Sequence, residues 1–128
     1  MPNLEISGTK GLVQVSGAGG HLKSIGTAPT LTVTTNGDGT CTVSGTDTIG
    51  ELTFANTWAD ADTVLVTFNK AYGTAPKVML SSAARINASG VNLIEIDTVA
   101  VTTTGFTLTA SGTCVGSLTY FVVETSAT

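Results

Sequence analysis

The sequence predicts an all-β fold, and three observations support that class. Threonine, valine and isoleucine dominate the chain, and β-branched residues suit strands better than helices. Short stretches alternate apolar with polar residues, and no window sustains the apolar spacing of a helix. Glycine fills 15 positions, while charged residues make up only 11% of the chain. We therefore expect an antiparallel β-sandwich, jelly-roll-like or Greek-key, of about seven to nine strands.

The first 26 residues differ from the rest because glycines interrupt two short apolar runs, LEIS and LVQVS. We interpret residues 1–26 as an extended N-terminal arm that lies on a neighbouring copy or a partner. The alternative is that the two runs form extra edge strands. In the first interpretation the partner-binding residues are Leu4, Ile6, Leu12, Val13 and Val15.

A glycine-rich stretch in this arm, SGAGGHLKS, has the glycines and the lysine of a phosphate-binding loop. That loop needs a glycine directly before its lysine, where this chain has Leu22. It also needs a following helix, which Gly26 and Pro29 prevent. We therefore interpret the stretch as a connector and expect no nucleotide site.

Residues 27–128 are predicted to form one β-sandwich domain. Alternation predicts strands at 31–35, 40–44, 51–55, 63–69, 76–82, 92–101, 106–110 and 117–124. The turn NGDG between the first two predicts that they form a hairpin. In the fourth, TVLVTFN, Val64, Val66 and Phe68 share one face and Leu65 lies on the other.

The last strand, SLTYFVVE, is apolar on both faces. One face of an antiparallel sheet serves the core of its own domain, so the other face needs a cover, and a second chain can supply it. Burying residues such as Phe121 and Val123 is worth about 1.5–3 kcal/mol each. We therefore expect self-association, with an interface drawn from Tyr120, Phe121, Val122 and Val123.

The charge balance argues against two classes of partner. The formal net charge is −4, and the five basic residues are scattered along the chain. Because a nucleic-acid binder needs clustered Lys and Arg, no nucleic-acid partner is expected. The longest apolar run, residues 120–123, is too short to span a membrane. The N-terminus also lacks the apolar core of a signal peptide.

Polar motifs give little support for catalysis or metal binding. Asp60 and Asp62 have the spacing of a cation-ligating pair but lack the further oxygens of a calcium loop, so a polar loop end is expected. His21 has no histidine or cysteine companion, and no serine has a nucleophile-elbow setting. Glu51, Glu95 and Glu124 could meet in space, although strand alternation indicates that each faces solvent. We expect no enzyme activity, cofactor or metal.

Two cysteines and two aromatic residues leave alternatives open. Cys41 and Cys114 lie in strand-like contexts, either as a disulfide joining distant strands or as two small buried hydrophobic residues. Trp58 and Tyr72 are expected in loops, where an exposed ring could stack on a sugar or anchor an interface. Alternatively, both rings cap the open ends of the sandwich.

Five blocks of the sequence, taken together, resemble a known family. GTAPTLTV, VSGTDTIGELTF, VTFNKAYGTAPKVML, TTTGFTL and LTYFVVE resemble a domain that recurs in bacteriophage virion proteins, at the C-termini of tail fibres and in small structural proteins of phage heads. The resemblance covers residues 26–124. It implies a β-sandwich that forms homotrimers, has no catalytic site, and belongs to a virion assembled in the host cytoplasm.

The resemblance implies two functions. The first is a trimeric capsid decoration or cement protein, which stabilises the phage head by binding the major capsid protein. The second is a tail-fibre or receptor-binding tip that recognises host-surface glycans. The short chain favours the first, whereas Trp58 and Tyr72 support the second.

Overall fold

The computed structural model describes residues 24–82 and 94–125 of the chain. The residues named for the predicted arm, Leu4, Ile6, Leu12, Val13 and Val15, lie outside the described residues, as does His21. Among the residues of the predicted arm that are described, Ser24 contacts the folded domain, because its hydroxyl lies 2.7 Å from that of Thr46.

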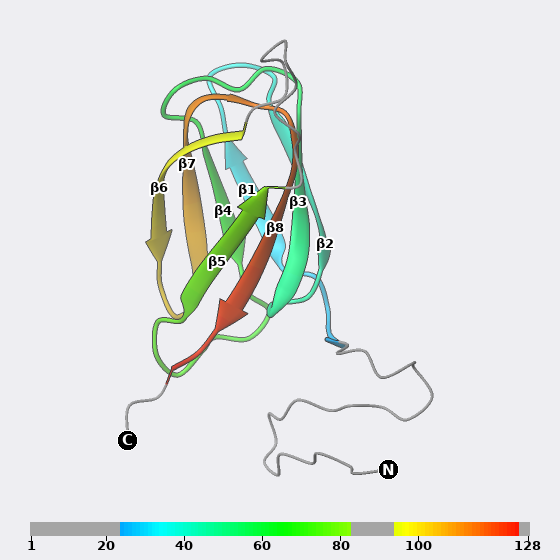
Figure 1. The fold of residues 1–128 in the computed structure, drawn as a ribbon, viewed down its shortest axis with the longest axis vertical. Helices are drawn as coiled ribbons and strands as arrows, with labels where there is room; N and C mark the ends of the chain where they lie inside the picture. Colours follow the sequence, from blue (N-terminus) through cyan, green and yellow to red (C-terminus); the bar gives the residue numbers. More distant parts are fainter. Residues whose placement is uncertain (1–23, 83–93, 126–128) are drawn as a thin grey trace.

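The described residues form two antiparallel sheets that pack face to face (Figure 1). The first sheet has the order β1 (Thr30–Thr34), β4 (Thr63–Thr67), β7 (Gly105–Cys114) and β6 (Ile94–Val101). The second has the order β2 (Thr40–Gly45), β3 (Ile49–Ala55), β8 (Gly116–Val123) and β5 (Lys77–Ser82). The predicted all-β sandwich and its strand number are confirmed, and no helix occurs in the described part of the chain.

Alternation along the strands supplies the core between the sheets. On β4, Val64 and Val66 are buried and pair with Leu108 and Phe106 of β7, while Leu65 faces outward as expected. The core comprises Leu52, Phe54, Trp58, Val64, Val66, Phe68, Phe106, Leu108, Ala110, Cys114, Leu118, Tyr120 and Val122. Threonines occupy most outward positions of the first sheet, where β-branching favours the strand and the hydroxyl meets water. The threonine-rich composition therefore reflects a solvated outer face.

The predicted hairpin between residues 31–35 and 40–44 is wrong. The two strands belong to different sheets: β1 pairs with β4, and β2 pairs with β3. The connection between them is bound to the segment that follows β3 instead of closing on itself. The backbone N–H of Asn36 donates to Asp62, and that of Thr57 donates to Asp38. These bonds favour a crossing between sheets over the tight turn that NGDG indicated.

The two faces of β8 have different surroundings. Tyr120 is 0% exposed and Val122 is 2% exposed, and both lie in the core of their own sandwich. Their assignment to an interface between chains is therefore corrected, because an interface residue must reach the surface. Phe121 is half-buried and Val123 is 36% exposed on the outer face, so these two remain candidates for contact with another chain.

The hydroxyl of Tyr120 makes a buried hydrogen bond that ties β8 to the turn before β3. It donates to the carbonyl oxygen of Thr46 at 2.6 Å. Gly50 permits this approach, since a Cβ at that position would collide with the tyrosine hydroxyl. Burial raises the pKa of Tyr120 to about 12, with a smaller contribution from the charge of Asp47.

The two cysteines occupy different environments. Cys114, at the end of β7, is 0% exposed, whereas Cys41 on β2 is half-buried against the core. The structure has no disulfide between them, and of the two only Cys114 is fully buried. Burial, and then the proximity of Cys114, raises the pKa of the Cys41 thiol to about 12.

Replacing Tyr120 by phenylalanine should destabilise the fold by about 1–3 kcal/mol, because the carbonyl of Thr46 would lose its buried donor. The free energy of unfolding from urea titrations measures this. The pKa of Tyr120 rises from 10.0 in the unfolded chain to about 12 in the folded protein. The protonated hydroxyl therefore stabilises the fold fully below pH 10, and this stabilisation is lost as the pH rises towards 12. In Tyr120→Phe, the free energy of unfolding should no longer show this part of the decrease at alkaline pH. Equal stability of the variant and the parent would contradict this role.

Both thiols should react slowly with a thiol-specific reagent at pH 8 while the protein is folded. The raised pKa keeps Cys41 protonated, and burial removes access to Cys114. Reaction should become fast in denaturing urea, which serves as the control. Mass spectrometry measures the extent of modification. Rapid modification of the folded protein would show that these positions open readily.

Candidate functional site

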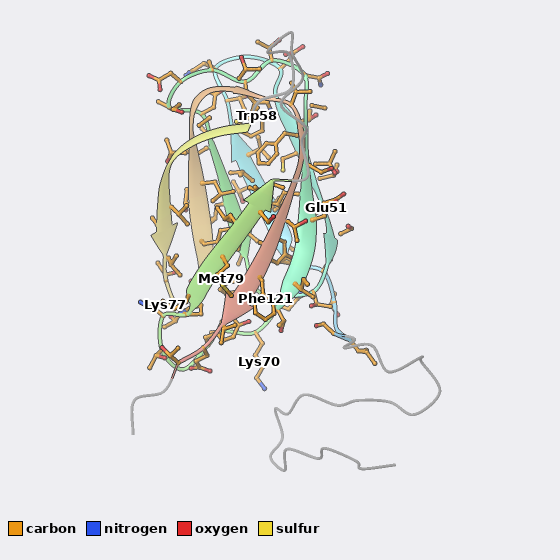
Figure 2. All side chains as sticks on the ribbon, viewed as in Figure 1. Glu51, Trp58, Lys70, Lys77, Met79 and Phe121 are labelled. Carbon is orange, nitrogen blue, oxygen red and sulfur yellow. The ribbon has the colours of Figure 1, made fainter. Side chains whose placement is uncertain are left out.

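The two ends of the sandwich differ in what they present to solvent. At one end lies Trp58, which is only 4% exposed, and Figure 2 shows Lys70 at the opposite end. The Trp58 ring packs edge-on against Phe54, and its Nε1 donates to the carbonyls of Thr40 and Ala55. Trp58 therefore caps its end of the sandwich, and its buried ring is not available to stack on a sugar.

Asp62 organises the loops at the Trp58 end. Asp62 is 1% exposed, and its carboxylate accepts hydrogen bonds from the backbone N–H groups of Asn36 at 2.9 Å and Ala59 at 2.8 Å. Asp60, its neighbour in the motif, is exposed. Within the described residues, no group of three or more His, Cys, Asp or Glu side chains is placed to hold a metal ion. Asp62 is therefore held within the loop by backbone donors, whereas Asp60 faces solvent.

The opposite end presents a half-buried aromatic ring, Tyr72, in the loop between β4 and β5. The ring packs edge-on against Phe68 at 4.9 Å, and its hydroxyl donates to the carbonyl of Asp47 at 3.3 Å. Burial raises the pKa of Tyr72, and the negative charges of Asp47 and Glu124 add to the rise. The hydroxyl thus stays protonated at neutral pH and remains a donor.

Asp47 holds the chain that leads to Tyr72. Its two carboxylate oxygens accept hydrogen bonds from the backbone N–H groups of Asn69 at 2.9 Å and Lys70 at 3.0 Å. The side-chain amide of Asn69 donates to the carbonyls of Thr27 and Ala28. Three segments far apart in sequence therefore meet here, and the loop has a defined shape.

Two charged side chains complete this end. Glu124, directly after β8, accepts hydrogen bonds through Oε1 from the backbone N–H of Thr74 at 2.8 Å and from its hydroxyl at 3.5 Å. Lys70 is exposed, and Figure 2 shows its side chain extending away from the body of the domain. We call Asn69, Lys70, Tyr72, Thr74 and Glu124, with the supporting Asp47, the Tyr72 loop end.

The groups of the Tyr72 loop end suit recognition of a polar, hydroxyl-rich ligand. A lysine ammonium donates, whereas a carboxylate and an amide oxygen accept, and each group can bind the hydroxyls of such a ligand. An aromatic ring can also cover an apolar patch on the ligand. A few directed polar groups beside an aromatic surface are typical of small-molecule sites. No nucleophile paired with a general base lies in this arrangement.

Sequence reasoning found Tyr72 but missed its neighbours. Asp47, Asn69 and Glu124 come from three separate segments of the chain, and nothing in their local spacing indicates that they meet. Glu51 and Glu124, considered as a pair of carboxylates, take different partners: Glu51 accepts from the Ser117 hydroxyl and Glu124 binds Thr74. The side chain of Glu95 lies outside the described residues.

Residues 63–121, from the first residue of β4 into β8, match the family model of the H-type lectin domain. The matched stretch includes four residues of the Tyr72 loop end, namely Asn69, Lys70, Tyr72 and Thr74. Neither the curated proteins nor the solved structures give a match. In the part of the chain that the structure describes, no helix is long and apolar enough to cross a membrane.

Replacing Asp47 by alanine should lower the free energy of unfolding by about 1–3 kcal/mol, because two backbone N–H groups lose their acceptor. Urea denaturation measures the loss. Asp60→Ala is the matched control, since Asp60 is exposed at the other end and its replacement should stay within about 0.5 kcal/mol. Equal effects of the two variants would argue against Asp47 as the organiser of the loop.

Proposed function

We propose that this protein binds carbohydrate through the Tyr72 loop end. The observation that carries the proposal is the match of residues 63–121 to the H-type lectin domain, which contains most of this end. A lectin site needs directed polar groups for sugar hydroxyls and an apolar surface for the face of the ring. Lys70, Glu124 and the half-buried ring of Tyr72 supply both.

The proposed roles follow from the groups that each side chain leaves available. Glu124 uses Oε1 for Thr74, so Oε2 can accept a hydrogen bond from a sugar hydroxyl. Asn69 donates through Nδ2 to backbone carbonyls, which leaves Oδ1 as a second acceptor. Lys70 supplies the donor, and the edge-on contact with Phe68 fixes the orientation of the Tyr72 ring. Asp47 positions the loop and does not touch the ligand in this arrangement.

Of the two functions weighed from the sequence, the lectin match supports glycan recognition. A role as a capsid decoration protein, a place in a phage virion and a homotrimeric state stay predictions, as does the absence of enzyme activity. A glycan-binding tip is compatible with the phage resemblance, because such tips meet host-surface sugars.

A glycan array tests the proposal, and calorimetric titration of the best ligand then measures its affinity. Lys70→Ala should weaken binding about tenfold, as loss of a charged hydrogen bond does. Tyr72→Ala should abolish binding, whereas Tyr72→Phe should retain most of it because the ring remains.

Asp60→Ala, at the Trp58 end, is the matched control and should leave affinity unchanged. Circular dichroism of each variant separates loss of binding from loss of fold. Absence of any glycan ligand would overturn the proposed function. A ligand whose affinity responds to Asp60→Ala but not to Lys70→Ala would overturn the assigned site.

A further inference from the structure

The outer face of the second sheet carries a continuous group of apolar side chains. Phe121 on β8 pairs with Ile49 on β3 and with Met79 on β5, so these three residues lie in one row across the sheet. Val123 follows two residues later on the same face of β8. Ile49 is 42% exposed, Met79 52% and Val123 36%. We call these four residues the apolar strip, and Figure 2 shows Met79 and Phe121 close together within it.

The outer face of the first sheet is different, which makes the apolar strip distinctive. There, Leu65 is the large apolar residue of β4, 38% exposed, and its partners across the sheet are Thr32 and Thr107. An isolated exposed leucine among threonines is ordinary on a protein surface. A contiguous apolar group that extends across three neighbouring strands of a sheet face marks a contact site.

Opposite charges flank the apolar strip. Glu51 on β3 pairs with Thr119, and Lys77 on β5 pairs with Val123. Because Thr119 and Val123 lie two residues to either side of Phe121 on β8, Phe121 is midway between the two charges. Strand spacing and rise place Glu51 and Lys77 about 17 Å apart, too far to pair within one chain. In Figure 2 these two residues lie on opposite sides of Met79 and Phe121.

We propose that two copies of this chain pack apolar strip against apolar strip, related by a two-fold axis that passes through Phe121. A two-fold contact is reciprocal. When a given residue of one copy touches a different residue of the other copy, the same pair also touches with the two copies exchanged. An axis in the plane of contact, perpendicular to the line from Glu51 to Lys77, brings Glu51 of each copy opposite Lys77 of the other. The apolar side chains then meet at the centre, and two ion pairs flank them.

We take a second copy of the chain as the partner because the charges on this face are complementary to those of the same face on another copy. A partner of another kind would not require one acidic and one basic residue at equal distances from a central aromatic ring. The homotrimer that the phage resemblance implies needs a contact between two different patches instead, since three-fold assembly is head-to-tail. The native mass therefore distinguishes the two arrangements.

Light scattering on the purified full chain, over a range of concentrations, tests the proposal. The expected native mass is twice the chain mass of 12.9 kDa. Met79→Asp should raise the dissociation constant about 30-fold or more, as loss of a central interface residue does. Leu65→Asp is the matched control, because it places the same charge at a partly exposed position on the other sheet and should leave the dimer intact.

Charge exchange tests the two-fold geometry without touching the apolar strip. Glu51→Lys and Lys77→Glu should each weaken the dimer a few-fold, and the double variant should restore it, since each copy would again face its complement. A parent protein with the mass of one chain or of three chains would overturn the proposal. A dimer that dissociates with Leu65→Asp but not with Met79→Asp, or that the double charge variant fails to restore, would overturn it as well.

Discussion

The hydrogen bond from Tyr120 to the carbonyl of Thr46 links the core of the sandwich to its candidate site. The tyrosine lies fully buried on β8, in contact with Phe106 from the opposite sheet. Its hydroxyl crosses the Cα of Gly50 to reach the turn before β3, and any side chain at Gly50 would block that path. The turn is thereby fixed to the rigid part of the molecule. Asn69, Lys70 and Tyr72 of the Tyr72 loop end are all hydrogen-bonded to Asp47 in this turn.

Asp47 connects this fixed turn to the surface loop that follows β4. It follows Thr46 in the same turn, and its carboxylate binds the backbone of Asn69 and Lys70 in the next loop. Asp62 acts in the same way at the opposite end, where it binds the backbone of Asn36 and Ala59. At each end, therefore, a carboxylate accepts backbone donors from a neighbouring connection. They differ in their aromatic residue, since Trp58 is buried and Tyr72 is half-buried beside charged side chains.

The two proposed surfaces use different parts of the same scaffold. The proposed carbohydrate site draws on loops at one end, where irregular backbone can direct several polar groups to one ligand. The proposed self-association draws on the outer face of β3, β8 and β5, where strand register places side chains in fixed rows. A sheet face suits repeated contact between identical chains because its pattern is regular. The two surfaces share no residue, so each proposal can fail without the other.

The sequence by itself determined the fold class and the positions of the strands. Alternation such as Val64, Leu65 and Val66 leaves no other face for the core, because successive side chains of a strand point to opposite sides. It also identified the apolar second face of β8 and the loop position of Tyr72.

Only the tertiary structure decided which strands pair and which side chains meet. The turn NGDG has the local chemistry of a hairpin, yet long-range bonds to Asp62 and Thr57 direct β1 and β2 into different sheets. Asp47, Asn69 and Glu124 meet at one end through connections that no local pattern relates. The midway position of Phe121 between Glu51 and Lys77 likewise depends on strand register. Local sequence controls the direction of each side chain, whereas its neighbours across the sheet come from distant parts of the chain.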